Sequence, residues 1–392
     1  MLERVCFLTN YNQYQSKRHF TKELSKAFEE EGVESTIFDV EDPQFRKMPH
    51  FKIHQASPDL TISFNSFVPS ADGKYLWEQL KIPHLSILVD PALYYMDMVA
   101  APYSIVSVVD RSDVEGIKSF GKQNVFFLPH GASRELAEEK AEEKEFDVVF
   151  IGSCYDYLSL RERWQEELTK GEVSLLEESI EIFLNDNVTP LHAALAVALS
   201  NQNISPKEID FMQIFRYLDI YTRGLDRIRL IRSIKDAKVH VFGGSCEGDI
   251  FPYRGWQDYL SDMANVTVHN PVDYEESHRI LKRSRISLNS SPFFKTGSHE
   301  RLFVPPLLGA LVVANDTVYT RKEFIDGRDI ILYPPKGWSH MNDRINAVLK
   351  DPTSLEGMVR LAKEKVLQNH TWNHRARTIK EIIPKLLTTI AS

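Results

Sequence analysis

The sequence has few cysteines. Its 392 residues include only Cys6, Cys154 and Cys246, which lie far apart with no CxxC pair. This spacing argues against a disulfide framework and a structural zinc site, and it favours a reducing compartment. No run approaches the roughly 18 apolar residues that span a bilayer, and the stretch before the first apolar run is too short for a secretory signal. We therefore predict a cytoplasmic protein with no transmembrane segment.

Positive charge is also scarce. Lys and Arg together number 47 against 55 Asp and Glu, which gives a formal net charge of −8. A broad surface for nucleic acid or for an anionic membrane needs a positive potential, so this balance argues against both and leaves only a local basic pocket. The hydrophobic share of 43% is ordinary for a globular protein, and the length suits two domains that each bury a core.

Several catalytic motifs are missing from the chain. There is no GxxxxGK[ST] phosphate loop, no GxGxxG after the first expected strand and no GxSxG nucleophile turn. The chain also has no HExxH, no Cys/His set at ligand spacing and no Asp-x-Asp pair to hold a divalent ion on a diphosphate. The sequence therefore predicts no metal ion and no resident cofactor.

The first part of the chain alternates apolar runs of strand length with helix-like stretches. Strands that are apolar along their whole length are typical of parallel sheets covered on both faces. The pattern predicts an α/β fold, with a Rossmann-like domain over residues 1–135. The expected strands are residues 5–9, 35–40, 60–64, 84–89, 104–109 and 125–128.

The second part repeats this alternation and predicts another Rossmann-like domain over residues 145–371. A helical stretch at about residues 158–222 separates its first two strands. We interpret it as an insertion that is a candidate contact for a homo-oligomer or a cap specific for the acceptor. The amphipathic segment 372–392 is expected to pack back on the first domain. The expected strands are residues 146–151, 239–242, 266–269, 286–289, 311–314 and 330–333.

Glycines follow two strands of the second domain. Gly152 and Ser153 follow its first strand, and Gly243 and Gly244 follow the next. Ligands of open α/β sheets bind outside the carboxyl ends of the strands, and a glycine there lets the backbone approach a phosphate. Because glycines also mark ordinary turns, donor binding and turn formation both stay open for these residues.

The densest group of polar side chains follows the strand that ends at residue 289. It contains Lys295, Gly297, Ser298 and Arg301, which are groups able to neutralise and hydrogen-bond an anionic diphosphate. The alternative is an ordinary helix N-terminus with a solvated His-Glu-Arg face. We favour the diphosphate site because a solvated face rarely combines glycine, serine, histidine and lysine.

Three motifs in this part of the chain are similar to those of a known family. They are GSHERLF at residues 297–303 with Gly309-Ala310 after it, FIDGRDIILY at 324–333 and HTWNHRA at 370–376. In these motifs the sequence resembles the CgeB/YkvP-like glycosyltransferases. The resemblance implies a GT-B fold of two facing Rossmann-like domains, with the sugar nucleotide in the C-terminal domain and the acceptor in the N-terminal one.

The resemblance also implies roles for single residues. Many relatives read Arg-x-Phe-Glu and hold the donor ribose with that Glu. The matching position here is Val304, so ribose binding falls to Glu300 or to another group. Lys295 and Arg301 would meet the charge of the leaving group without a metal ion. Asn270 is expected to lie in the loop that faces the nucleoside base.

Catalytic candidates come from both domains. They are Asp90, His299 and Glu300. Asp90 is similar to an Asp-Pro element of the relatives and would act as the base for the acceptor hydroxyl, although a turn residue before Pro91 is an equal alternative. The acceptor-side candidates are Asn10, Tyr11 and His130. For His130, packing in the connection between the domains is as good an explanation as chemistry.

The sequence thus predicts a glycosyltransferase that moves a sugar from a nucleotide-sugar donor to an acceptor hydroxyl without a metal ion. Two alternatives stay open. One is a catalytically silent protein that binds a sugar nucleotide or builds a surface or spore layer, which Val304 and the insertion both permit. The other is a nucleotide-sugar epimerase or hydrolase, because two Rossmann-like domains serve those reactions as well.

Overall fold

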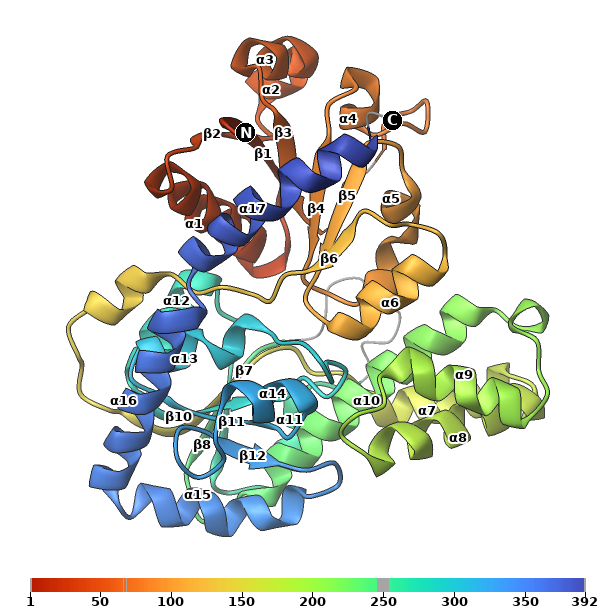
Figure 1. Ribbon diagram of the computed structural model, residues 1–392. Coiled ribbons are helices and arrows are strands. Elements are labelled where there is room, and N and C mark those ends of the chain that lie inside the picture. Colours follow the sequence, from red (N-terminus) through yellow and green to blue (C-terminus); the bar gives the residue numbers. More distant parts are fainter. Residues whose placement is uncertain (1, 66, 68, 245–253, 391–392) are drawn as a thin grey trace. The chain divides into compact units, whose positions relative to one another are not determined.

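The computed structural model describes residues 2–65, 67, 69–244 and 254–390, and Cys246 lies outside them. The chain divides into two compact units, drawn in Figure 1. Unit 1 contains Met1–Glu135 and Lys365–Ser392, and unit 2 contains Leu136–Glu364.

Unit 1 is built on a parallel sheet of six strands in the order β2-β1-β3-β4-β5-β6. Every residue of β3, β4 and β5 is buried, as expected for strands covered by helices on both faces. The expected strands are all present, with ends that differ by at most one residue. They are β1 (Arg4–Thr9), β2 (Glu34–Asp39), β3 (Leu60–Phe64), β4 (His84–Leu88), β5 (Ser104–Val108) and β6 (Val125–Phe127).

Helices connect these strands and cover the sheet. In α1 (Ser16–Glu30), Phe20, Leu24 and Phe28 recur every fourth residue and form the buried face. The short helices between β2 and β3 were not predicted from the sequence. The other helices of this unit are α2 (Pro43–Lys47), α3 (Pro49–Ala56), α4 (Leu76–Leu80), α5 (Met96–Ala100), α6 (Arg111–Ser119) and α17 (Trp372–Ile390).

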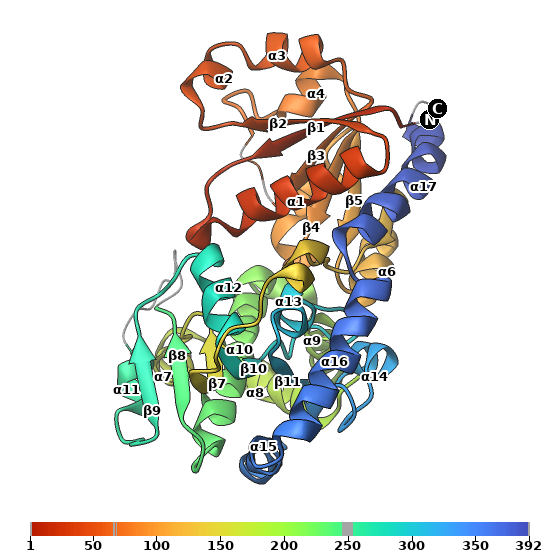
Figure 2. The ribbon, with the colours of Figure 1, turned by 90° about the vertical axis from the view of Figure 1, so that its left-hand side faces the viewer.

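The C-terminal helix α17 packs against α1 (Figure 2). Its first residue, Trp372, has its ring centroid 6.0 Å from that of Phe20 and 5.7 Å from that of Phe64. A Cβ atom on Gly131 would lie 2.8 Å from the Trp372 indole, so only glycine fits under this ring. The segment that ends the chain therefore completes the core of unit 1.

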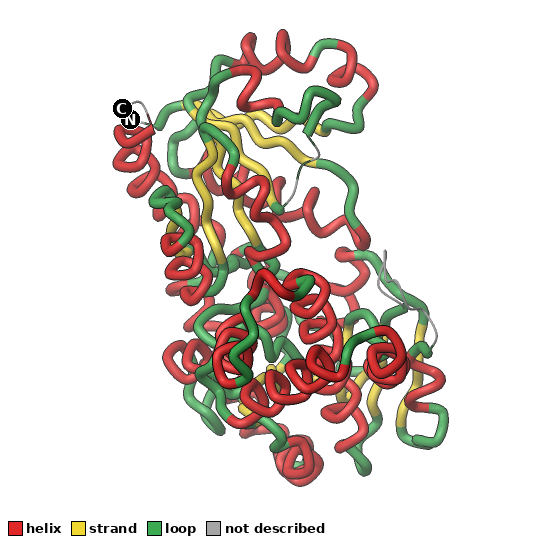
Figure 3. The backbone as a smooth tube through the Cα atoms, turned by 90° about the vertical axis from the view of Figure 1, so that its right-hand side faces the viewer, coloured by secondary structure: helices red, strands yellow, loops and turns green. Residues whose placement is uncertain are grey.

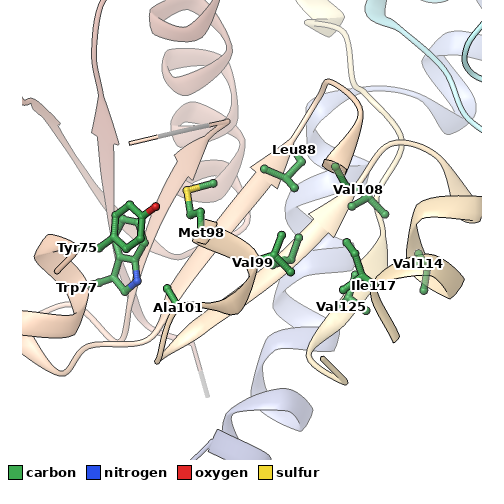
Figure 4. Packing of buried hydrophobic residues seen from close by; sticks show 12 residues of the cluster. Tyr75, Trp77, Leu88, Met98, Val99, Ala101, Val108, Val114, Ile117 and Val125 are labelled. Atoms are coloured by element: carbon green, nitrogen blue, oxygen red, sulfur yellow. The ribbon is translucent and has the colours of Figure 1, made fainter. Parts of the chain in front are cut away.

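A second part of that core lies on the β4–β6 side of the sheet (Figure 4). Met98 and Val99 from α5 belong to it. Trp77 stacks between Tyr75, at 4.5 Å between ring centroids, and His84, at 3.7 Å. Burial lowers the pKa of His84 to about 3, so this histidine is a neutral core residue.

Unit 2 has a parallel sheet of six strands in the order β12-β11-β10-β7-β8-β9. Counted along the chain from β7, this is the 3-2-1-4-5-6 order of the Rossmann fold. Figure 3 shows the strands of each unit lying between helices. The strands are β7 (Phe146–Ile151), β8 (Val239–Phe242), β9 (Val266–His269), β10 (Ser284–Asn289), β11 (Leu311–Asn315) and β12 (Ile331–Tyr333).

The expected helical insertion forms three helices and the first half of a fourth. They are α7 (Tyr157–Glu167), α8 (Lys170–Asn185), α9 (Leu191–Asn201) and α10 (Phe211–Ser233). A capping box between Thr169 and Glu172 begins α8. The predicted end of the insertion at residue 222 falls inside α10, which continues without a break to Ser233. The insertion is therefore continuous with the helix that leads into β8.

The remaining helices of unit 2 follow β8. No helix in the described part of the chain is long and apolar enough to cross a membrane. Cys6 and Cys154 are buried free thiols. The remaining helices are α11 (Trp256–Leu260), α12 (Tyr274–Lys282), α13 (Val304–Leu307), α14 (Val318–Glu323), α15 (Met341–Leu349) and α16 (Pro352–Asn369), the last of which crosses the division between the units.

Candidate functional site

The sheet of unit 2 has a topological switch point between its neighbouring strands β7 and β10. From β7 the chain builds outward through β8 and β9, and from β10 it builds the other way through β11 and β12. Ligands of such sheets bind outside the carboxyl ends of the strands at this point. Gly152 follows β7 and Ser290 follows β10, so the loops with the predicted donor-binding residues begin here.

Gly152 and Gly243 make a close backbone contact. A Cβ atom on Gly243 would lie 2.0 Å from the carbonyl oxygen of Gly152, a distance that no side chain can occupy. The same oxygen accepts a hydrogen bond from Trp256 Nε1 at 3.1 Å, and Gly152 N donates to Phe242 O at 2.9 Å. Gly243 is therefore required by the packing of two loops, and not by a left-handed backbone.

Arg301 lies over Gly152. Its Nη1 atom is 3.3 Å from the place that a Cβ atom on Gly152 would take. The side chain is 28% exposed, and its Nε atom is 3.9 Å from Glu300 Oε1. Within the described residues the guanidinium has no hydrogen-bond partner. The structure thus brings two of the predicted donor-binding residues together, with a partly exposed cation above a glycine.

A small cavity with polar and apolar walls lies between the loop after β10 and the end of β11. Its volume of about 10 Å³ suits about one water-sized polar group. Ser298 is 2% exposed, and its Oγ atom has no hydrogen-bond partner in the described part of the chain. Burying a hydroxyl without a hydrogen bond costs free energy. A ligand atom in the cavity that pairs with Ser298 Oγ would remove this cost. The lining residues are Asn289, Ser291, Phe294, Gly297, Ser298, His299, Leu302, Ala314, Asn315, Thr317 and Thr320.

The catalytic candidates His299 and Glu300 form a contact pair at the start of the short 3-10 helix η5 (Glu300–Leu302). His299 Nδ1 lies against Glu300 Oε2, and Glu300 is 7% exposed. Val304, two residues after this helix, is 3% exposed and packs in the core. An apolar side chain at that depth offers nothing to a ribose hydroxyl, so Glu300 is the nearest carboxylate in the motif.

Lys295 differs from its predicted role. It is 3% exposed, and its Nζ atom donates to the carbonyl oxygen of Asp186 at 3.2 Å and to that of Phe183 at 3.5 Å. The ammonium also lies 4.0 Å from the centroid of the Phe183 ring. These carbonyls belong to the C-terminal end of α8, where a cation is favourable. The structure therefore places the charge of Lys295 on the helical insertion.

Asn270 is exposed in the loop after β9. The next residue, Pro271, has its Cγ atom 3.5 Å from the place of a Cβ atom on Gly244, so the loops after β8 and β9 are adjacent. Below them, His240 Nδ1 and His269 Nε2 share a hydrogen bond of 2.9 Å. Asn270 and Gly244 thus lie at the same edge of the sheet as the glycine contact described above.

Two arginines of α10 contact the loops at this edge of the sheet, Arg227 the loop after β7 and Arg223 the loop after β10, and sequence reasoning missed both. Arg227 Nη1 donates to the carbonyl oxygen of Ser153 at 2.6 Å. One turn earlier, Arg223 donates to Asp219 at 2.6 Å and lies 3.8 Å from the centroid of the Phe293 ring. The sequence did contain a signal for them, since two arginines four residues apart on the apolar side of a predicted helix need buried partners.

Asp226 was also missed. It is 3% exposed and lies between the two arginines in sequence. Its carboxylate accepts hydrogen bonds from Ser290 Oγ at 2.6 Å, Tyr333 OH at 2.7 Å and Trp338 Nε1 at 2.8 Å, and from Asn315 Nδ2 at 3.0 Å. This carboxylate joins α10 to the last residues of β11 and β12 and to residues that follow β10 and β12. No local sequence pattern indicates these partners, which lie 64 to 112 residues away.

Unit 1 has its own switch point, between β1 and β3. Asn10 follows β1 and accepts a hydrogen bond from Lys17 Nζ at 2.9 Å. Asn65 follows β3 and donates to Asp90 Oδ2 at 2.8 Å, and Tyr95 OH donates to the same oxygen at 3.4 Å. Asn10 and Asp90 were predicted from the sequence, whereas Lys17, Asn65 and Tyr95 were not.

The other two acceptor-side candidates lie in different surroundings. Tyr11 is 46% exposed next to Asn10. His130 is 2% exposed, with its ring centroid 4.5 Å from that of Phe20 and 5.0 Å from that of Trp372. Its carbonyl oxygen accepts hydrogen bonds from Arg375 at 2.8 and 3.0 Å. The structure thus favours the packing alternative for His130.

Lys17 leads to a pH-dependent prediction. Burial lowers its pKa from 10.5 to about 8, although the charge of Asp90 opposes this shift. Between pH 8 and 10.5 the unfolded chain therefore binds more protons at this residue, and the free energy of unfolding should rise with pH by about 2–3 kcal/mol. Lys17→Met should remove the contribution of Lys17 and leave that of Lys144, whose pKa burial also lowers to about 8. Lys22→Met, at an exposed position of α1, should keep the whole rise.

Urea unfolding of these proteins at pH 7 and pH 10 measures the effect. A rise in Lys17→Met that is as large as that of wild type would show that Lys17 does not contribute to it.

Comparison with known proteins finds a family model that matches part of the chain. Residues 226–381, less than half of the chain, match a family model described as glycosyl transferase-like. A search of curated proteins finds no match.

Solved structures share the fold of the whole chain. Sucrose-phosphate synthase from Thermosynechococcus elongatus is 12% identical with a TM-score of 0.55, and the match covers 99% of this chain and 100% of that one. A glycosyltransferase from Rickettsia africae is 10% identical with a TM-score of 0.55, covering 98% and 99%. HepE from Anabaena, in complex with UDP-glucose, is 11% identical with a TM-score of 0.54, covering 97% and 99%.

These likenesses establish the class of fold. The chain has the GT-B fold of two Rossmann-like units, as predicted from the sequence. The shared fold and the glycosyl transferase-like segment together support a transferase enzyme.

Proposed function

We propose that the chain transfers a sugar from a nucleotide-sugar donor to an acceptor hydroxyl, and that unit 2 binds the donor. The observation that carries this proposal is the position of Arg301 over Gly152 at the carboxyl end of β7. A diphosphate needs a cation and closely placed N–H donors, and a guanidinium above a glycine backbone offers both. The glycosyl transferase-like match across residues 226–381 supports transfer over the silent and epimerase alternatives.

The reaction needs stabilisation of the leaving group. As the acceptor oxygen forms its bond to the anomeric carbon, the bond from that carbon to the diphosphate oxygen breaks. The bonding electrons leave with the nucleoside diphosphate, whose negative charge must be met in the transition state. We assign this task to Arg301 and to the backbone N–H groups of Gly297 and Ser298. With these groups the transfer needs no metal ion.

The rest of the donor is assigned to neighbouring groups. The Oγ atom of Ser298 would pair with a hydroxyl of the transferred sugar. Glu300, held against His299, would accept hydrogen bonds from the ribose in place of the missing carboxylate at Val304. The loop with Asn270 would read the edge of the base. Lys295 has no part in this scheme, because its ammonium is bound at the end of α8.

The acceptor is assigned to unit 1. Asp90 would take the proton of the attacking hydroxyl, with Asn65 and Tyr95 orienting its carboxylate. Asn10, Tyr11 and the cation of Lys17 would position the acceptor.

The motifs at residues 297–303, 324–333 and 370–376 support the finer assignment to a CgeB/YkvP-like enzyme, and the cysteine spacing supports a cytoplasmic location.

A thermal-shift panel of nucleotide sugars, each with and without EDTA, tests this function. UDP-glucose comes first, because the HepE structure contains it. We expect one donor to raise the melting temperature by about 5 °C or more at saturation, with no change on adding EDTA. Free nucleoside diphosphate should then appear when acceptors are supplied as a fractionated extract.

Each other outcome of the panel has a definite meaning. A shift that EDTA abolishes contradicts the metal-free mechanism. Conversion of the donor to a second nucleotide sugar, with no free nucleotide, indicates an epimerase. The absence of a shift with every donor indicates a silent relative.

A further inference from the structure

The segment between β2 and β3 presents large apolar side chains to the solvent. Met48, which joins α2 to α3, is 54% exposed, and Phe51 in α3 is 61% exposed. Phe45 and Ile53 from the same segment are 2% and 0% exposed, so the segment is firmly packed on the sheet. The exposed side chains are therefore held outward by a fixed local structure.

Cationic residues flank these apolar residues in the sequence. Residues 43–56 contain Arg46, Lys47 and Lys52 and no Asp or Glu, which gives this segment a charge of +3 in a chain of net charge −8. In the described part of the chain none of the three cations is paired with a carboxylate. We call Arg46, Lys47, Met48, Phe51 and Lys52 the α2–α3 patch.

The nearest acidic residues in sequence are already engaged. Glu41 forms an ion pair with Arg18 at 2.6 Å. Asp42 caps α2, because its side chain accepts a hydrogen bond from Gln44 N at 2.9 Å. Both carboxylates therefore have partners outside the patch. The positive charge of the α2–α3 patch is left available for an external partner.

We propose that the α2–α3 patch docks unit 1 on the surface of an anionic lipid bilayer. Protruding Phe and Met side chains enter the boundary between headgroups and acyl chains, while flanking Lys and Arg pair with anionic headgroups. An acidic polymer would satisfy the cations but would leave Met48 and Phe51 in water, so the combination favours lipid. The net charge of the chain argues against a broad membrane surface but leaves room for this local one.

Vesicle flotation of the full chain tests the proposal, and its outcome does not depend on the proposed transferase activity. The protein should float with vesicles of phosphatidylcholine that contain about 30% phosphatidylglycerol, and should not float with pure phosphatidylcholine. Raising the salt to about 0.5 M should weaken the binding, because ions screen the headgroup charge.

Matched variants locate the surface. Phe51→Glu should lower the vesicle partition coefficient at least about tenfold, and Lys47→Gln with Lys52→Gln should lower it about twentyfold. Phe120→Glu is the control, since Phe120 is 72% exposed at the end of α6. Figures 1 and 2 place α2 and α3 at one end of unit 1 and α6 at the other, so α6 lies outside the α2–α3 patch.

All the substituted side chains lie at the surface or only half-buried, and circular dichroism and the melting temperature check that each variant folds. Failure of the folded wild type to float would overturn the proposal. So would equal binding of Phe51→Glu and wild type, or a loss confined to Phe120→Glu. Binding to heparin beads without binding to vesicles would assign the cations to an acidic polymer and would also overturn it.

Discussion

Arg301→Ala is expected to lower the rate of donor-dependent sugar transfer about hundredfold or more while unit 2 stays folded. The guanidinium is partly exposed and lies over Gly152. Its removal takes away a long ion pair of 3.9 Å with the buried Glu300, which keeps its contact with His299. The loss should therefore appear in turnover and in the thermal shift caused by the donor, and not in the melting temperature of the free protein.

Three control variants separate the role of the Arg301 guanidinium from general effects of a substitution. Arg301→Lys should recover part of the rate, because it keeps the charge but loses the planar guanidinium. Arg279→Ala removes a surface arginine of α12 that is 66% exposed, and should act like wild type. Asp90→Asn in unit 1 should lose transfer and keep the donor-induced shift. Wild-type turnover in Arg301→Ala would remove Arg301 from the site.

Gly243→Ala is expected to destabilise unit 2 by about 3 kcal/mol or more and to abolish the donor-induced thermal shift. The added Cβ atom would lie 2.0 Å from the Gly152 carbonyl oxygen, so one of the two loops must move. That movement displaces the backbone beneath Arg301. The melting temperature should fall by about 6–12 °C in a domain of this size.

Gly244→Ala is the matched control for this variant. Its Cβ atom would meet the Pro271 ring at 3.5 Å, which is an ordinary contact, so stability should stay close to that of wild type. Calorimetry or urea unfolding of both variants measures the difference. Equal stability of the two would contradict the close contact between Gly152 and Gly243.

The strands and the placement of several proposed donor-site residues were predictable because both depend on local sequence. A strand buried on both faces is apolar throughout, and the polar or glycine residues after it lie at the carboxyl edge of the sheet. This rule alone identified Gly152, Gly243 and the segment with Arg301 as neighbours. It also identified Asn10 and Asp90 as residues of the corresponding edge in unit 1.

The misplaced and missed residues have partners that only the folded chain brings near. Lys295 was assigned to the diphosphate from its place in the motif, but its carbonyl partners come from the end of α8, more than 100 residues earlier. Asp226 accepts hydrogen bonds from four side chains at the carboxyl ends of β10, β11 and β12 and in the loops after them. Lys17 was not predicted as a site residue, since its burial depends on which face of α1 meets the sheet.

The unbroken course of α10 limits how the insertion can vary in length. A single residue added within an α-helix turns everything beyond it by about 100°. Such a change before residue 223 would swing Arg227 away from the Ser153 carbonyl and Asp226 away from its four donors. Variants of this protein should therefore differ in length mainly in α9 and the loop after it, because the end of α8 binds Lys295. In contrast, α10 should lengthen or shorten only by about seven residues at a time, which restores nearly the same orientation of its side chains.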